Sequence, residues 1–247
     1  MRAADPIVPP PEAVADSARG TPPNTRDPFL RIAGVAGLSV PALAIVINVV
    51  LLAPPPEPPS GLDAPIAEVA AYVAERGDRL ALGHALRYAA QVLNLVFAAG
   101  LYRLVQGSHD GAHRGWAIVG LLGAVWIPSV GIVAQSFEGV AVWQAGSLAE
   151  QPQLALALWG SSTFLWNSIL VPFSALMLGF SLAGGASARF PRWLVVLGLA
   201  AAASAFAGAC ITAATAAEGW SVPVDVFLIL VLPWTVSASI VMIRGAA

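Results

Sequence analysis

The segment LALGHALRYAAQVLNLVFAAGLYRLVQ, residues 80–106, is apolar and long enough to cross a bilayer as a helix. Its first half nevertheless contains His84, Arg87, Tyr88, Gln91 and Asn94. At about 100° per residue, these five side chains fall within an arc of about 120° on a helix. A charged residue inside such a segment costs roughly 2.5 to 3.5 kcal/mol on insertion scales, so it should face a partner, a cavity or the interface. The segment therefore predicts a membrane helix with one polar face.

The composition of the whole chain agrees with this reading. Of 247 residues, 57% are hydrophobic and 11% are charged, against roughly 25% charged residues in an ordinary soluble domain. The net charge is −2 and there is no basic cluster, which excludes nucleic-acid binding. All twelve basic residues are arginine, which excludes lysine Schiff bases and the phosphate-binding lysine of Walker motifs.

Cysteine usage excludes two further kinds of site. The single Cys210 lies in an apolar run, so there is no internal disulfide and no cysteine-based metal cage. We expect it to be a small buried thiol. The sequence predicts no cofactor and no metal site.

The chain begins with an arm and an amphipathic segment that differ from the apolar spans. Residues 1–30 are rich in proline and contain no apolar signal-peptide core, so a disordered arm is predicted, with residues 31–247 as the membrane domain. Residues 62–76 repeat Ile66, Val69 and Val73 on one face, opposite Glu68, Glu75 and Arg76. This predicts a separate interfacial helix that covers the start of the second span.

Six apolar segments are long enough to span a bilayer at about 1.5 Å per residue. They are residues 32–53, 80–106, 116–135, 154–182, 193–215 and 224–243. The predicted fold is therefore an all-α membrane helix bundle with six transmembrane helices and one external interfacial helix. The first, third, fourth and sixth spans contain an internal proline, which is compatible with kinked helices around a cavity or with an inverted repeat. The fifth span has small residues every four positions, which favours close helix packing.

The distribution of arginine along the chain predicts the orientation of the protein in the membrane. An even number of spans places both termini on one side, and that side contains nine arginines, whereas the other contains two, Arg76 and Arg79. By the positive-inside rule both termini are cytoplasmic, in the cell (inner) membrane. Trp116, Trp193 and Trp220 fall at predicted span ends, where interfacial tryptophans are expected.

With this orientation the rare polar groups converge on the outer leaflet. His84 and Arg87 enter the second span from outside, Gln135 and Glu138 lie at the outer end of the third, and Asp225 lies at the outer entry to the sixth. One interpretation is an outward-facing pocket roofed by residues 62–79, with Arg87 paired with Glu138 among spans two, three and six, or bound to an anionic head group. The other is a structural ion pair or a snorkelling arginine, with solvated acids around it.

The fourth span contains Trp159, Trp166 and Asn167. The two tryptophans are seven residues apart and therefore share a helix face, which suits either a groove for a lipid or flat ligand, or core packing. A dyad of His84 and Glu138 could carry out acid–base chemistry on a lipid, but no nucleophile motif accompanies it.

Two segments of the chain resemble a known family. The segment APIAEVAAYVAERGD leading into LALGHAL, and ARFPRWLVVLGLAAA at residues 188–202, resemble a bacterial family of six-span integral membrane proteins classed as a domain of unknown function. The resemblance covers about residues 30–245 and implies a fold only. It implies no reaction, substrate or cofactor.

Three classes of function remain open. The first is an accessory or scaffold subunit of a larger membrane assembly, without catalysis of its own, whose arm docks on a protein partner or a second copy. The second is a transporter, or a protein that binds membrane lipids or another hydrophobic ligand, with the pocket around Arg87 as its site. The third is an intramembrane enzyme acting on a lipid.

Overall fold

The computed structural model describes residues 27–52, 66–106, 111–144, 151–215 and 222–245. These residues are almost entirely helical and include no strand. The elements are α2 (Pro28–Ile45), the π-helix η1 (Val46–Leu52), α3 (Ile66–Val105), α4 (Gly111–Trp143), α6 (Pro152–Ser168), α7 (Leu170–Ala186), α8 (Arg192–Thr215) and α9 (Val222–Gly245). By length and composition, six helical segments can cross a membrane. The predicted all-α bundle with six membrane helices is confirmed.

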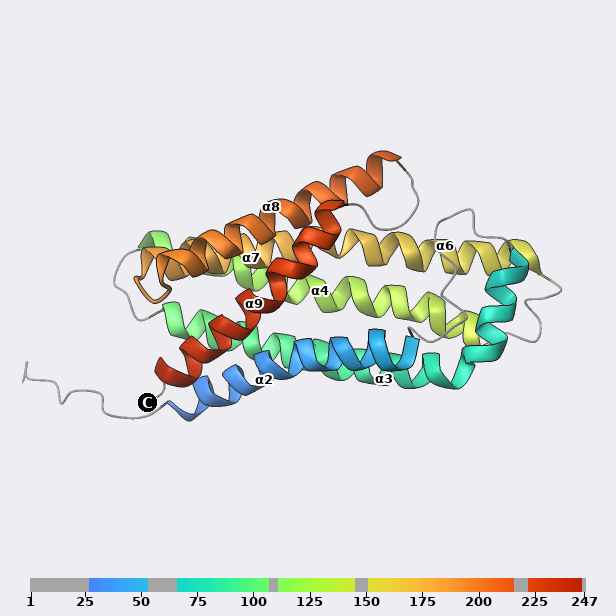
Figure 1. Cartoon of the computed structure of the whole chain (residues 1–247), viewed down its shortest axis with the longest axis horizontal. Helices are drawn as coiled ribbons and strands as arrows, with labels where there is room; N and C mark the ends of the chain where they lie inside the picture. The colour runs from blue at the N-terminus through green and yellow to red at the C-terminus, as the bar shows by residue number, and fades with distance from the viewer. Residues whose placement is uncertain (1–26, 53–65, 107–110, 145–150, 216–221, 246–247) are drawn as a thin grey trace, which may run out of the picture.

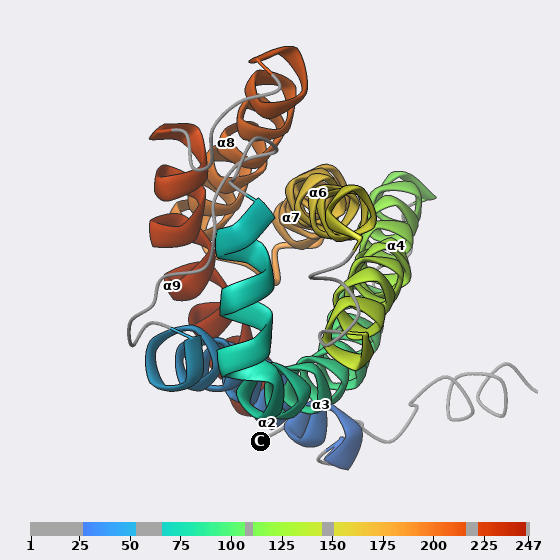
Figure 2. The same ribbon diagram turned by 90° about the vertical axis from the view of Figure 1, so that its right-hand side faces the viewer.

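The helices form a closed ring. Each membrane helix packs on its neighbour in the sequence, and α9 returns to pack on α2. Figure 2 shows this arrangement along the long axis of the molecule. The start of α2 and the end of α9 lie at the same end of the bundle in Figure 1, as an even number of spans requires. The opposite end, where α3 begins and α4 ends, is called the far end below.

The second span is longer than the sequence suggests. Instead of a separate interfacial helix before residue 80, residues 66–105 form one helix of 40 residues, about 60 Å long at 1.5 Å per residue. Figure 1 shows its first turns crossing the far end at a steep angle to the rest. The prediction of a separate helix is thus wrong for residues 66–76, because the helix continues through Gly77 and the charged residues that follow it; residues 62–65 lie outside the described residues.

Arg76 is the main surprise in these first turns. The sequence places it on the polar face, yet it is only 2% exposed and shares the buried face of Val69, Tyr72 and Val73. Its Nη1 donates to the carbonyl oxygen of Leu51 at 3.4 Å. Because Leu51 lies at the end of η1, where carbonyls have no partner within the helix, a cation is favoured there.

The first span begins earlier than predicted. Asp27 caps α2 by accepting a hydrogen bond from the Phe29 amide at 3.1 Å, and Pro28 occupies the first helical turn. Asp27 also accepts a hydrogen bond from Arg103 Nε at 2.5 Å. α2 therefore begins at Pro28, with Asp27 as its N-cap, and residues 1–26 of the predicted arm lie outside the described residues.

The fourth span is broken at Ile169, between α6 and α7. Pro172 explains the break because it has no amide hydrogen and its ring clashes with the carbonyl four residues earlier. Pro41, Pro128 and Pro233 remain inside continuous helices. The span thus contains two helical halves, and only the first half, α6, extends to the far end (Figure 1).

The closest approach between helix backbones lies between α4 and α7. A Cβ on Gly123 would lie 2.5 Å from the amide nitrogen of Leu176 and 2.7 Å from the carbonyl oxygen of Pro172. Gly179 of α7 packs directly on the backbone of Gly120. The fifth span, α8, also packs closely, through Gly198 against Trp234. The close packing expected of the fifth span is therefore present, and the third and fourth spans share it.

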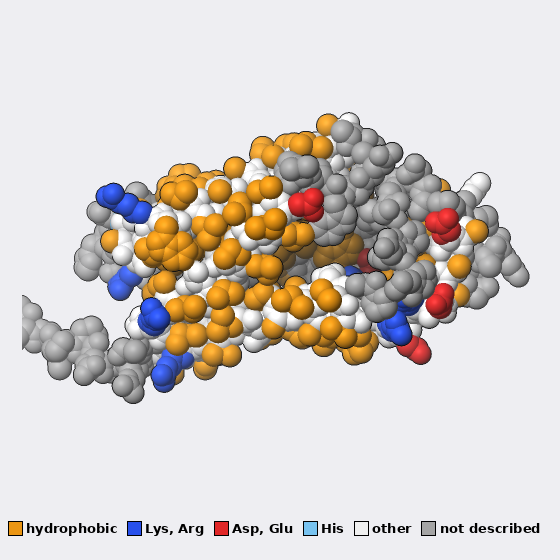
Figure 3. Space-filling model, viewed as in Figure 1, with side chains coloured by type: hydrophobic (Ala, Val, Ile, Leu, Met, Phe, Trp, Pro, Cys, Tyr) orange, Lys and Arg blue, Asp and Glu red, His pale blue; other side chains and the backbone are white. Residues whose placement is uncertain are grey.

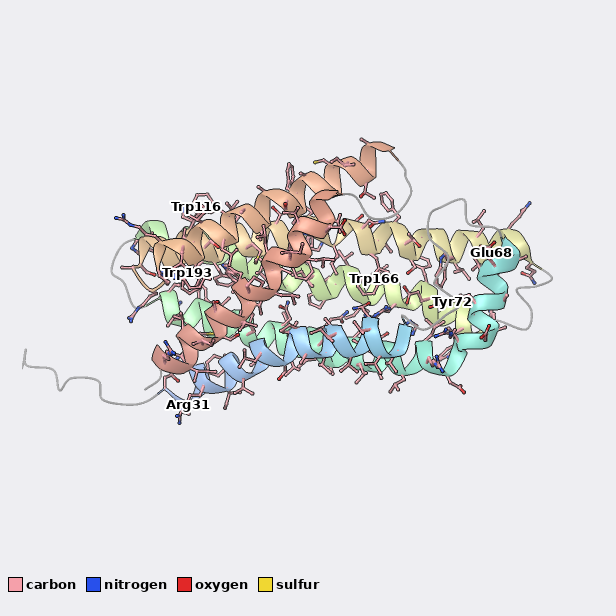
Figure 4. All side chains as sticks on the ribbon, viewed as in Figure 1. Arg31, Glu68, Tyr72, Trp116, Trp166 and Trp193 are labelled. Carbon is pink, nitrogen blue, oxygen red and sulfur yellow. The ribbon has the colours of Figure 1, made fainter. Side chains whose placement is uncertain are left out.

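The exposure of two tryptophans and of the cysteine can be compared with the sequence-based predictions. Trp116 and Trp193 are exposed and lie at the end of the bundle opposite the far end (Figure 4), as predicted for interfacial tryptophans. Trp220 lies outside the described residues. Cys210 is exposed on α8 rather than buried, so the expectation of a buried thiol is wrong.

Candidate functional site

A single buried carboxylate joins three helices near the far end. Glu138 of α4 is buried, and its Oε2 accepts hydrogen bonds from His84 Nε2 at 2.8 Å and Arg87 Nη1 at 2.9 Å, both on α3. Its Oε1 accepts from Ser162 Oγ at 2.8 Å and Trp166 Nε1 at 2.6 Å, both on α6. The predicted contact between Arg87 and Glu138 is therefore present.

The local sequence explains why these side chains converge. His84 and Arg87 are three residues apart and Ser162 and Trp166 are four apart, so each pair lies on one face of its helix. Glu138 lies on α4, which packs against both α3 and α6. Its carboxylate can therefore reach both faces.

The Arg87 guanidinium has a second contact. Its Cζ lies 4.9 Å from the centroid of the Trp166 ring, within the range of a cation–π interaction. Trp166 thus holds the arginine with its ring while its N–H binds the carboxylate. The guanidinium is therefore fixed from two sides.

A second layer of aromatic side chains covers the site toward the far end. Trp159 is buried and packs edge-on against Tyr72, with ring centroids 5.7 Å apart. Val69, Val73 and Leu80 pack in the same apolar cluster. Figure 4 shows Tyr72 and Glu68 on the bent start of α3, beyond Trp166. The bent segment therefore covers the site, as a lid at this position was expected to do.

The depth of the site follows from helix geometry. Glu138 is 22 residues from the interfacial Trp116 on the same helix, which corresponds to about 33 Å. The hydrocarbon core of a bilayer is about 30 Å thick. The helix length between Trp116 and Glu138 thus matches the thickness of the hydrocarbon core.

The surface is hollowed beside this site. Figure 3 shows a depression between α2 and the start of α9, with acidic and basic side chains at its bottom. Trp166 lies at the same place in the matching view of Figure 4. The Arg87 side chain of the cluster is 20% exposed, so the cluster is not sealed from the surface.

Three amides continue the polar face of the α3–α4 contact. They are Gln91 and Asn94 on α3 and Gln135 on α4. Gln135 is 1% exposed and Asn94 is 8% exposed. Neither amide atom of Gln135, nor Asn94 Nδ2, has a hydrogen-bond partner among the described residues.

Other predicted site residues lie elsewhere. Tyr88 is 43% exposed and is not among the donors to Glu138. Asp225 is exposed in the first turn of α9, so the sixth span does not complete the site, contrary to expectation. Asn167 is half-buried next to Trp166 but does not contact Glu138.

Sequence reasoning missed some contributors. Ser162 carried no signal beyond its spacing of four from Trp166, and Tyr72 was counted with the interfacial helix. The helix that completes the site is α6, the first half of the fourth span. The side of α6 that meets the site could have been predicted, because Trp159, Ser162 and Trp166 lie on one face of this helix. Ser162 and Trp166 bind Glu138, and Trp159 packs on Tyr72.

The geometry limits the chemistry that Glu138 can perform. His84 and Glu138 are within hydrogen-bond reach, as an acid–base dyad would require. However, a carboxylate has about four lone-pair positions, and four protein donors occupy them here. Glu138 is therefore an anchor for donors rather than a free base. Among the described residues, no three His, Cys, Asp or Glu side chains are grouped so as to hold a metal ion.

Six helices long and apolar enough to cross a membrane indicate a multi-pass α-helical membrane protein, with the ionic cluster held among α3, α4 and α6. No family model, curated protein or solved structure matches the chain. The resemblance to a six-span family of unknown function therefore stays a prediction.

Proposed function

We propose that this membrane protein binds a lipid or another amphiphile and holds its anionic head group at Arg87. The observation that carries the proposal is that this guanidinium is partly exposed and keeps hydrogen-bond donors free for a ligand. Its side chain is 20% exposed, and among the described residues its one hydrogen-bond acceptor is Glu138. An arginine has five N–H donors in a planar fork that suits phosphate or carboxylate.

The surroundings support this proposal. Glu138 and Trp166 fix the guanidinium before any ligand arrives, which reduces the entropy lost on binding. The depth of about 33 Å from Trp116 corresponds to the head-group region. The depression in Figure 3 gives an amphiphile a lateral route for its apolar part.

The proposal includes the orientation of the protein in the membrane. Nine arginines on the side that the predicted topology gives to both termini, against two on the other side, favour cytoplasmic termini in the cell membrane. The site then faces the outer leaflet. We expect reporter fusions after residues 110 and 187 to read as cytoplasmic and a fusion after residue 148 to read as external; one reversed reading would contradict the topology.

Ligand binding can be measured as thermal stabilisation in mild detergent. We expect phosphatidylglycerol to raise the melting temperature more than diacylglycerol, which lacks the phosphate. Arg87→Lys keeps the charge beside Glu138 but loses the planar fork. Because hydrogen bonds to charged groups contribute about 1.5 to 3 kcal/mol, this variant should bind phosphatidylglycerol roughly ten- to a hundredfold more weakly.

The matched control is Arg103→Lys. Arg103 lies on the same helix, at the other end, and also contacts a carboxylate, that of Asp27. Its substitution should leave the lipid effect unchanged. Equal lipid effects in wild type and Arg87→Lys, or an equal loss in both variants, would contradict the assignment of the head group to Arg87.

The scaffold interpretation remains the second candidate. It is favoured by Trp143, whose side chain at the end of α4 is 90% exposed, and by the saturated Glu138. A stoichiometric protein partner retained in mild detergent would support it, particularly if Trp143→Ala released that partner.

A further inference from the structure

His84 and Arg87 bind the same oxygen atom of Glu138. Nε2 of His84 lies 2.8 Å from Oε2, and Nη1 of Arg87 lies 2.9 Å from it. The imidazole and the guanidinium are therefore neighbours. Because a carboxylate only accepts hydrogen bonds, Nε2 carries the proton of the neutral ring, and Nδ1 is the atom that takes up a second proton. A change of charge on His84 thus acts directly on the arginine.

The His84 ring is accessible to a second proton. Among the described residues it makes one hydrogen bond, through Nε2. Its side chain is 11% exposed, and Nδ1 is not one of the fully buried atoms that lack a partner. The ring can therefore gain a proton without breaking a hydrogen bond of the cluster.

The two fixed charges next to His84 cancel each other. Glu138 accepts hydrogen bonds from an arginine and three further donors, which favour its ionised form, and Arg87 carries the opposite charge. With a neutral His84 the cluster has no net charge, whereas a protonated His84 makes it cationic. Charges interact more strongly away from bulk water, so a cationic cluster binds an anion more tightly.

The elements packed around His84 contain few other charges. Neither α6 nor η1 has a titratable side chain, and Glu138 is the one charged residue of α4 beyond residue 114. On α3, Tyr72 and Arg76 lie on the buried face of the first turns, and the other charged residues of these turns are exposed: Glu68, Glu75, Asp78 and Arg79. Arginine and tyrosine keep their charge between about pH 5 and 8, whereas histidine ordinarily changes its charge there. A pH-dependent charge in the cluster is therefore assigned to His84.

We propose that protonation of His84 strengthens the binding of an anionic amphiphile at Arg87, so that the site binds its ligand more tightly at acidic pH. The ligand class is an amphiphile whose head group stays anionic at acidic pH, as a phosphodiester lipid does. This inference rests on the proposed function, because it concerns the regulation of the same site. By thermodynamic reciprocity, the bound anion also favours the protonated form of His84.

The test is the affinity for phosphatidylglycerol, measured in mild detergent at about pH 8 and about pH 5.5 from the thermal stabilisation it adds over diacylglycerol. We expect the affinity of the wild type to rise at least about fivefold toward the lower pH, as is typical of two coupled sites. His84→Gln keeps an amide donor for Glu138 but has no proton to gain. The ratio of its affinities at the two pH values should be about one, whatever its affinity at either pH.

The matched control is His113→Gln. His113 lies in the first turn of α4, at the other end of the helix from Glu138, and its substitution should leave the wild-type ratio unchanged. A second measurement uses the wild type alone and therefore does not depend on the folding of a variant. At a fixed pH near the midpoint of its titration, the His84 imidazole resonance should shift toward the protonated form when phosphatidylglycerol is added.

The outcomes separate this inference from the head-group site itself. If phosphatidylglycerol stabilises the wild type more than diacylglycerol does, but its affinity has the same pH dependence in His84→Gln or the imidazole resonance does not move, the role of His84 is overturned and the head-group site stands. If the two lipids stabilise the wild type equally at both pH values, the head-group site is overturned, and the role of His84 with it.

Discussion

Glu138→Ala is expected to be the most damaging single substitution in the ionic cluster. It leaves His84, Arg87, Ser162 and Trp166 without their shared acceptor. Removing one partner of a buried ion pair typically costs about 3 to 5 kcal/mol, because the other charge is left uncompensated. For a chain of this size that corresponds to a fall of roughly 6 to 20 °C in the melting temperature, measured in detergent.

Arg87→Ala tests the other partner. It should also lower the melting temperature, since Glu138 then loses a cationic donor in a buried site. The double variant Arg87→Ala/Glu138→Ala should lose less than the sum of the two, with an interaction energy of about 0.5 to 3 kcal/mol. Glu75→Ala, an exposed glutamate on α3, is the control and should change stability by less than about 0.5 kcal/mol. Near-neutral single variants, or strictly additive effects, would show that the pair contributes little.

The sequence indicates the Arg87–Glu138 pair because an unpaired arginine inside a membrane helix is unfavourable in free energy. An arginine inside an apolar span favours a nearby acceptor, and Glu138 is the acid at matching depth, so the pair was one of the interpretations that the sequence allowed. The identity of the third helix does not follow. Which face of the fourth span meets Glu138 depends on helix rotation and on the break at Pro172, and neither is encoded in one short motif.

The fold shows the same division. The number of spans and the tryptophans at their ends follow from hydrophobicity and length, and the structure agrees. Helix ends in polar segments were less predictable. The charges around Gly77 indicate an interface, yet α3 continues through them because a helix can leave the membrane without stopping. Arg76 was misplaced for a related reason, since its apolar stem allows it to lie on a buried face.

Gly123→Ala is expected to be strongly destabilising for a purely geometric reason. The new methyl group would lie 2.5 Å from the Leu176 amide nitrogen and 2.7 Å from the Pro172 carbonyl oxygen, which are backbone atoms. Neither atom can rotate away as a side chain would, so α4 and α7 must separate. Overpacking of a dense core costs typically 1 to 3 kcal/mol, or roughly 2 to 12 °C in the melting temperature.

Gly139→Ala provides a control on the same helix. A Cβ there meets nothing within 4 Å, and alanine favours a helix over glycine by about 1 kcal/mol. This variant should therefore be neutral or slightly more stable than wild type. The comparison separates close packing from helix propensity, because both variants make the same chemical change in α4. If Gly123→Ala and Gly139→Ala had the same melting temperature, the close contact between α4 and α7 would not contribute to stability.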